Sequence, residues 1–168
     1  GVVDLSTPGQ PELTYSGSPG VALLNIDLRG KLAAAAIGNS GMALIDLSDA
    51  GVPKKVSQLG PGLFMLRDVS LRNNLAFGAD YFRVNEVPII NTALPETPFF
   101  AGQIDFSKYK DSNGLSIDTT AELVALTTTD QRLYVGQYQK LADNKNIAPV
   151  CTVIQPAEST QVTAGAQI

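Results

Sequence analysis

A short pattern of hydrophobic and polar positions recurs along this chain at nearly constant spacing. In each copy a pair of apolar residues is followed by Asp or Asn, then by two residues that are most often Leu and Ser, and a proline follows five positions later. The copies are residues 2–6 with Pro11, residues 44–48 with Pro53, and residues 89–93 with Pro98. The second apolar residues, Val3, Ile45 and Ile90, are 42 and 45 positions apart. The pattern indicates a repeated apolar strand that ends in a polar turn.

A second landmark has the same period. The segments Leu28–Leu32 (LRGKL) and Leu71–Leu75 (LRNNL) are typical of two strands joined by a tight turn, and they are 43 positions apart. A repeat of about 40–45 residues made only of strands is typical of the β-propeller, in which each blade is a four-stranded antiparallel sheet. One blade cannot bury both of its faces, so blades stack against their neighbours. We therefore expect an all-β fold, a β-propeller-type array of four-stranded antiparallel blades.

The repeated pattern resembles that of the LVIVD-repeat β-propellers, whose units carry an apolar pair, an Asp, an apolar residue, a Ser and then a Pro. The resemblance covers residues 1–104 well and residues 105–160 loosely. It implies a bacterial or archaeal propeller that is secreted or located at the cell surface. It transfers no catalytic residues, because the family has no universal catalytic set.

The repeat predicts one domain over residues 1–160 and a tail over residues 161–168. Its parts are a half blade, residues 1–17, and three further units, residues 21–60, 64–104 and 115–160. Propellers usually have four to eight blades, and a chain that opens on the third strand of a blade leaves a bare sheet edge. We therefore expect an incomplete ring, completed by another chain or by the rest of the same protein. A small four-bladed ring with a degenerate last blade is the alternative.

Two assignments depend on the repeat frame. Residues 31–37 are rich in alanine, which favours helix, but the run is short for a helix and aligns with strands of the other units, so we expect a strand. In the last unit the polar segment 105–120 is expected to be a link. Glu122–Thr127 and Arg132–Gln137 are then the first two strands, Val150–Gln155 is the third, and the tail supplies at most a weak fourth.

Composition narrows the classes of function. Only 17% of residues are charged and the net charge is −4, so neither nucleic acid nor an anionic membrane is expected as a partner. The longest apolar run, near Leu32–Ile37, is far shorter than the ~20 residues of a spanning helix, so no membrane insertion is expected. Histidine is absent, which removes the Ser-His-Asp triad and most zinc sites. The single cysteine, Cys151, lies among apolar residues and is expected to be an inert buried thiol.

No cofactor and no metal site are expected. The glycine-rich motifs that bind nucleotides are absent. Asp105, Asp111 and Asn113 offer oxygen ligands, but they lack the spacing of a calcium loop, and ordinary turn chemistry explains them. A pair of catalytic carboxylates remains open, because spacing along the chain does not show which acids meet in space.

The longer loops carry the candidate binding residues. In a propeller-type array the loops before the third and before the first strand of each blade share one end, and here they lengthen along the chain. Aromatic and cationic side chains in such loops are suited to stack on sugars or to anchor a protein. The candidates are Tyr81, Phe82 and Arg83 in one loop, Tyr109, Lys110 and Asp111 in a second, and Tyr138, Asp143 and Lys145 in a third.

The sequence therefore favours a non-catalytic surface or secreted module that binds a protein or a glycan through this long-loop face. Two alternatives remain. One is an enzyme that acts on glycosides with a pair of carboxylates, and the other is a structural unit that assembles with other chains through its sheet edges.

Overall fold

A computed structural model of the chain describes residues 1–17, 20, 22–49, 52–82, 86–106, 112–138 and 151–155. These residues form strands, turns and connecting segments and contain no helix, so the prediction of an all-β fold is confirmed. Their fourteen strands make four antiparallel sheets, and strands that follow one another in sequence are neighbours within each sheet.

The first sheet is a two-stranded ribbon, and each of the other three has four strands. The N-terminal ribbon consists of β1 (Val2–Asp4) and β2 (Glu12–Tyr15). Sheet I consists of β3 (Asn25–Arg29), β4 (Leu32–Ala36), β5 (Met42–Asp46) and β6 (Lys54–Leu59). Sheet II consists of β7 (Leu66–Arg72), β8 (Leu75–Asp80), β9 (Glu86–Asn91) and β10 (Phe99–Asp105). Sheet III consists of β11 (Gly114–Thr119), β12 (Leu123–Thr128), β13 (Leu133–Tyr138) and β14 (Cys151–Gln155).

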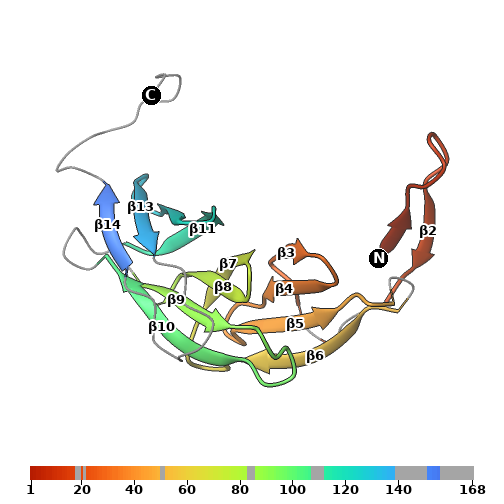
Figure 1. The fold of residues 1–168 in the computed structure, drawn as a ribbon, viewed down its shortest axis with the longest axis horizontal. Helices are drawn as coiled ribbons and strands as arrows, with labels where there is room; N and C mark the ends of the chain where they lie inside the picture. Colours follow the sequence, from red (N-terminus) through yellow and green to blue (C-terminus); the bar gives the residue numbers. More distant parts are fainter. Residues whose placement is uncertain are drawn as a thin grey trace.

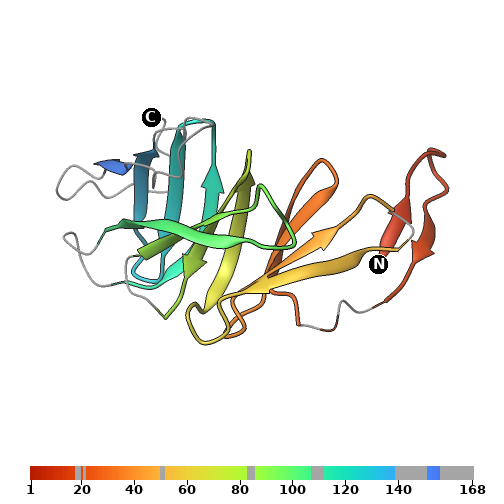
Figure 2. The same ribbon diagram turned by 60° about the horizontal axis from the view of Figure 1, so that its bottom comes forward.

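The sheets follow one another along an open arc that begins at the N-terminal ribbon and ends at sheet III (Figures 1 and 2). The first strands of sheets I, II and III, which are β3, β7 and β11, lie on the concave side of the arc, and β6 and β10 lie on the convex side (Figure 1). No sheet closes on itself, and the arc formed by the described residues does not close into a ring.

The repeated sequence pattern corresponds to a repeated turn at the end of the third strand of a unit. The side-chain oxygen of the Asp or Asn accepts a hydrogen bond from the backbone N–H two residues later. The three bonds are Ser6 N to Asp4 Oδ1 at 2.8 Å, Ser48 N to Asp46 Oδ1 at 2.8 Å, and Ala93 N to Asn91 Oδ1 at 2.9 Å. At the preceding apolar pair, a β-bulge interrupts pairing with the next strand in all three copies. The pattern therefore encodes an Asx turn and a bulged outer edge.

The alanine-rich segment forms strand β4, so the rival helical interpretation is wrong. Its four alanines, Ala33–Ala36, are fully buried. Ala34 and Ala36 contribute to the core shared with sheet II, whereas Ala33 and Ala35 contribute to a cluster on the opposite face. Alternate residues of a strand face opposite sides, and small side chains fit where both sides are crowded. The packing thus overrides the helical preference of alanine.

The expected strand order of the last unit is wrong by one strand. The predicted polar link contains β11, which is the first strand of sheet III, so β12, β13 and β14 are the second, third and fourth strands. In β11 a bulge lies between Gly114 and Ser116, and Ile117 is the one large buried residue. A short strand with this interrupted alternation lacks the apolar pattern from which the others were predicted. The turn at residues 129–131 consequently joins the second and third strands.

The core lies between neighbouring sheets. Between sheets I and II it includes Ala34, Met42, Leu44, Leu71 and Ile90. Between sheets II and III it includes two aromatic pairs, Phe77 with Tyr138 at a ring-centroid distance of 4.9 Å and Phe106 with Tyr134 at 5.1 Å. Sheet II therefore has apolar side chains buried on both faces, and it is the central layer of the fold.

Side chains on the concave side join the first strands of neighbouring sheets. Asp27 Oδ2 on β3 accepts a hydrogen bond from Leu71 N on β7 at 2.7 Å, and Arg29 Nε donates to Leu71 O at 2.9 Å. In the next interface, Asp68 Oδ2 on β7 accepts from Ile117 N on β11 at 2.9 Å and from Ser116 Oγ at 2.6 Å. These bonds satisfy backbone groups on strand edges that no neighbouring strand pairs.

We expect Leu44→Ala to lower the free energy of unfolding by about 2–5 kcal/mol, because Leu44 is fully buried between sheets I and II. Leu44→Asp should prevent folding by placing a charge in that interface. Urea denaturation followed by circular dichroism measures both effects. Leu94→Ala is the control, since Leu94 is 67% exposed and its replacement should change stability by less than about 0.5 kcal/mol. Equal effects at the two positions would contradict the assignment of the core.

We expect Asp68→Ala to lower the free energy of unfolding by about 1–3 kcal/mol, because it leaves the buried N–H of Ile117 without its acceptor. Asp118→Ala is the matched control, because Asp118 lies on β11 and is exposed, and its carboxylate accepts a bond from the N–H of the adjacent Thr119. Calorimetry of both variants tests the difference. If Asp68→Ala is no more destabilising than Asp118→Ala, the concave-side bonds do not stabilise the interface.

Candidate functional site

The carboxylate of Asp80, the last residue of β8, holds the backbone in the described part of the predicted long-loop end. Asp80 is fully buried, and its Oδ1 accepts hydrogen bonds from Met65 N at 3.1 Å and Phe82 N at 2.8 Å. Tyr81 N also donates to Met65 O at 2.9 Å. The segment that links sheet I to sheet II is thereby fastened to the residues that follow β8. We call Met65, Arg67, Asp80, Tyr81 and Phe82 the β8 corner.

Two side chains of the β8 corner form a preorganised pair. The guanidinium carbon of Arg67, on β7, lies 4.1 Å from the centroid of the Tyr81 ring, a distance at which the cation is attracted to the π-face. Phe82 follows directly and is 74% exposed. The corner thus presents an exposed aromatic residue directly after a tyrosine whose ring is stacked with a cation. Arg, Tyr and Phe are residue types that anchor protein interfaces.

The sequence-predicted site residues have different outcomes. Tyr81 and Phe82 lie at the β8 corner, in the segment that directly follows β8. Tyr138 was expected in a loop, which is wrong: it is the last residue of β13, and its ring is buried against Phe77. Its hydroxyl donates to Thr120 O at 2.9 Å. The remaining six candidates, Arg83, Tyr109, Lys110, Asp111, Asp143 and Lys145, lie outside the described residues.

Tyr138 and the β8 corner lie at opposite ends of sheet III. The backbone of Asp80 is close to Gly114, where a methyl group in place of the glycine hydrogen would come within 3.0 Å of the Asp80 carbonyl oxygen. Tyr138 instead bonds to Thr120, just beyond the other end of β11. Six residues of strand separate these ends, which is about 20 Å. The described tyrosines therefore do not form one continuous loop face, because the one-strand shift in sheet III moves Tyr138 to the opposite end.

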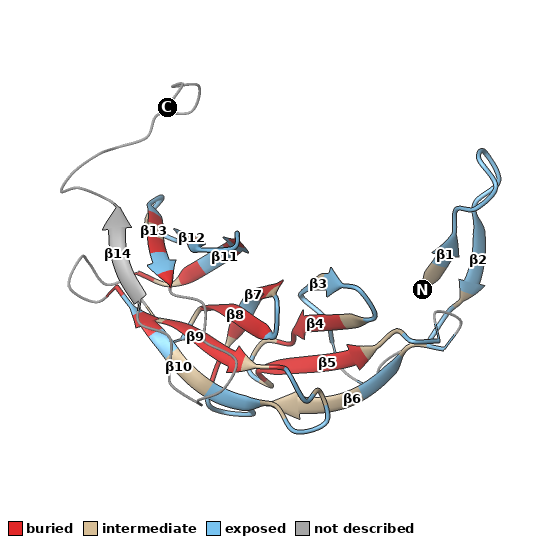
Figure 3. Ribbon diagram, viewed as in Figure 1, coloured by how far each residue is buried: buried red, intermediate tan, exposed pale blue. Residues whose placement is uncertain are grey.

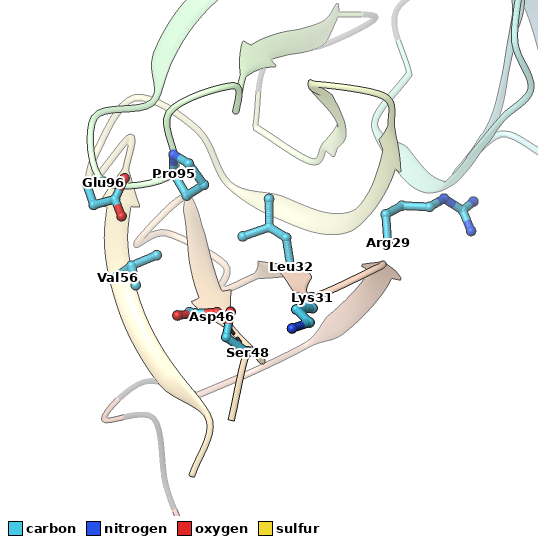
Figure 4. Close-up of a pocket in the computed structure, with 8 residues that line it drawn as sticks. All are labelled: Arg29, Lys31, Leu32, Asp46, Ser48, Val56, Pro95 and Glu96. Carbon is cyan, nitrogen blue, oxygen red and sulfur yellow. Dashed lines mark hydrogen bonds between the residues drawn. The ribbon is translucent and has the colours of Figure 1, made fainter. Parts of the chain in front are cut away.

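A separate groove lies at the end of sheet I that holds the β3–β4 turn, where the turn between β9 and β10 approaches the sheet (Figure 4). Its volume is about 320 Å³, at the lower limit for small-molecule pockets. Ser57 Oγ donates to Pro95 O at 2.6 Å and fixes this turn against β6. The lining residues are Arg29, Lys31, Leu32, Asp46, Ser48, Val56, Pro95 and Glu96.

The groove combines charged side chains of both signs with three apolar residues, Leu32, Val56 and Pro95, and none of its lining residues is aromatic. Asp46 is held ionised, because the hydroxyl and the backbone N–H of Ser48 donate to its carboxylate and lower its pKa, with a further contribution from the nearby charges of Lys31 and Lys54. A general acid requires the opposite shift. The local bond of Asp46 is also the repeated Asx turn, so its environment is explained by the fold. The groove is suited to a small polar molecule but has no feature that selects one.

The sequence interpretation missed Arg67 and Asp80. Asp80 had a usable signal, because an acid that directly follows an apolar strand also occurs at Asp46, where it caps a turn. Arg67 had none, because its contact with Tyr81 depends on the pairing of β7 with β8 and on the Asp80 bonds.

No three His, Cys, Asp or Glu side chains of the described residues lie close enough together to hold a metal ion. A search of the same residues finds no helix with the length and apolar character needed to cross a membrane. The side chain of Cys151 is outside the described part of the structure.

No protein-family model matches this chain. A search of curated proteins also finds no match.

We expect the Asx turn at Asp46 to make stability depend on pH. The carboxylate has an ordinary pKa of 3.8 and a lower one in the folded protein. Its contribution is therefore present at pH values above 3.8 and is lost as the pH falls through the folded value. Asp46→Asn retains an acceptor oxygen, as Asn91 does in sheet II, so at pH 7 it should lower the melting temperature less than Asp46→Ala.

Thermal melts between pH 7 and pH 2.5 test this expectation. The difference between the wild type and Asp46→Asn should be largest at neutral pH and should shrink below about pH 4. Glu12→Gln, an exposed change on β2, is the control. A pH-independent difference, or an Asp46→Ala melt equal to that of the control, would contradict a stabilising turn.

Proposed function

We propose that sheets I, II and III are successive blades of a β-propeller-type array similar to the LVIVD-repeat proteins. The proposal is supported by their common four-stranded antiparallel order and by the Asx turn and bulge that sheets I and II share. It is also supported by the position of the first strands on the concave side of the arc. Secretion or display at a prokaryotic cell surface belongs to the same proposal and depends on the resemblance.

Within this proposal, the chain is a non-catalytic module that binds a protein partner through the β8 corner. The observation that carries it is the 74% exposure of Phe82 beside the Arg67–Tyr81 stack. Asp80 fixes the backbone on which Phe82 is displayed, so little conformational entropy is lost when a partner covers the ring.

A protein partner fits the β8 corner better than a glycan does. Arg67 occupies one face of the Tyr81 ring, which leaves that ring less able to stack on a sugar. Arg and Tyr are instead enriched among the residues that contribute most to protein interfaces, and Phe is enriched at interfaces in general.

Site-specific photocrosslinking tests the binding function. Phe82 is replaced by p-benzoylphenylalanine, and the protein is irradiated with proteins from the source organism. We expect one specific crosslinked partner from position 82 and none from position 94, because Leu94 is similarly exposed but lies in the turn after β9.

The purified partner then provides a quantitative test. Phe82→Ala should weaken its affinity at least about tenfold, which corresponds to about 1.4 kcal/mol. Leu94→Ala should leave the affinity unchanged, and the melting temperature of both variants should match the wild type. An unchanged affinity for Phe82→Ala, or equal crosslinking from both positions, would refute binding at the β8 corner.

A further inference from the structure

The N-terminal ribbon is the outer half of a repeat unit. Its strand β1 carries the same apolar pair, Asx turn and bulge as β5 of sheet I and β9 of sheet II. β5 pairs with β4 on one side and β6 on the other, and β9 likewise pairs with β8 and β10. Among the described residues β1 pairs only with β2. Its inner edge therefore presents unpaired backbone groups, where the other units have a second strand.

The face of sheet I that points away from sheet II is exposed at its first strand, β3. Ile26 and Leu28 of β3 lie opposite Ala35 and Ala33 of β4, so the four side chains share this face. Ile26 is 43% exposed and Leu28 is 51% exposed. Figure 3 shows the contrast between the exposed strand β3 and the buried strands β4 and β5 beside it.

The equivalent residues of sheet II are covered by the neighbouring sheet. In the 43-residue frame, Val69 and Leu71 correspond to Ile26 and Leu28. They are only 3% and 0% exposed, because they belong to the core formed with sheet I. Leu32, Ala34 and Ala36 of β4 pack in that core, and Asp27 of β3 bonds to Leu71 N. In sheet II, the hairpin formed by the first two strands of the preceding sheet thus covers the apolar residues of the first strand.

We propose that a β-hairpin of this same repeat type, supplied by a partner chain, binds at the inner edge of β1 and covers Ile26 and Leu28. Its second strand would pair with β1, as β4 pairs with β5, and complete a four-stranded sheet. Its first strand would lie beside β3 and offer a carboxylate to the backbone of β3, as Asp27 does to Leu71. A single hairpin of this kind would pair with the open edge of β1 and would also bury Ile26 and Leu28 of β3.

The ribbon itself is oriented for this arrangement. Val2 and Tyr15 are cross-strand partners, so they lie on one face, and they are the two partly buried residues of the ribbon. Val2 corresponds to Leu44 and to Ile89, which point toward the following sheet. A two-stranded ribbon is marginal alone in water, so two added strands stabilise it. The inference depends on the repeat units and not on partner binding at the β8 corner.

A duplicated hairpin placed in cis tests the proposal. A copy of residues 22–42, which contains β3, β4 and the short loop before β5, is fused directly before Gly1, because Ala43 aligns with Gly1 in the repeat. This copy is chosen because its Leu32, Ala34 and Ala36 already cover the equivalent face of sheet II. Fusion supplies a high effective concentration, so weak pairing is still detected.

We expect the amides of Val2–Asp4 and Asn25–Arg29 to exchange with deuterium at least about tenfold more slowly in the fused protein than in the original chain, and the melting temperature to rise. Ile26→Lys with Leu28→Lys in the original β3 should abolish both effects. Leu123→Lys with Leu133→Lys, on similarly exposed positions of sheet III, should leave them intact. If the lysine pair prevents folding of the unfused chain, Ile26→Thr with Leu28→Thr replaces it.

Two results would overturn the proposal. The first is unchanged exchange at Val2–Asp4 in the fused protein. The second is a dimer of the unfused wild type that dissociates when Ile26 and Leu28 are replaced, because a second copy would then cover the face in place of a hairpin. A failure of the Phe82 crosslinking experiment would leave this test unaffected.

Discussion

Packing of one sheet against the next is the interaction on which the rest of this structure depends. Each four-stranded sheet has apolar residues on both faces, as Leu44 and Ile45 show by facing different clusters. Burial of apolar surface is worth roughly 25 cal/mol per Å², so a sheet with one face in water loses much of its stabilisation. Sheet II, which has a neighbour on each side, is buried along almost the whole of β7, whereas β3 of sheet I is largely exposed. Position in the array, more than local sequence, determines how far the first strand of a sheet is buried.

The concave-side hydrogen bonds fix how the sheets align. Small apolar side chains such as the alanines of β4 pack well in several registers, and they do not select one. The bonds from Asp27 and Arg29 to both backbone groups of Leu71 admit a single register, as do the two bonds to Asp68. Charged groups are costly to bury without partners, so a shift of one residue along the strand would be strongly opposed. The polar side chains therefore specify the geometry that the apolar ones stabilise.

The sequence was informative where the signal was local. The Asx turn requires only an Asp or Asn and the N–H two residues later, so three copies of it could be located by spacing alone. Strand β11 was missed because its bulge and its single large buried residue, Ile117, break the alternation. That omission gave every later strand of sheet III the wrong place in the order and put the end of β13 at the wrong end of the sheet, whereas the loop placement of Tyr138 came from a strand predicted one residue too short. The β8 corner was half predicted: Tyr81 and Phe82 are loop aromatics, but their fixation by Asp80 and Arg67 arises from contacts between segments that the sequence does not place side by side.

The two sheets at each interface contribute different groups, so the two ends of the array differ. In both interfaces the carboxylate comes from the earlier sheet and the backbone N–H from the later one. Among the described residues, the array therefore begins with the exposed apolar face of β3, at the place where a backbone N–H donates to a carboxylate in the other interfaces, and it ends with Asp118, Leu123 and Leu133 exposed on sheet III. Unlike, complementary ends favour head-to-tail growth of copies into open filaments. The N-terminal ribbon opposes this, because it already provides the outer half of the unit before sheet I. An intact four-stranded sheet of another copy cannot add there without displacing the ribbon, whereas a two-stranded hairpin can.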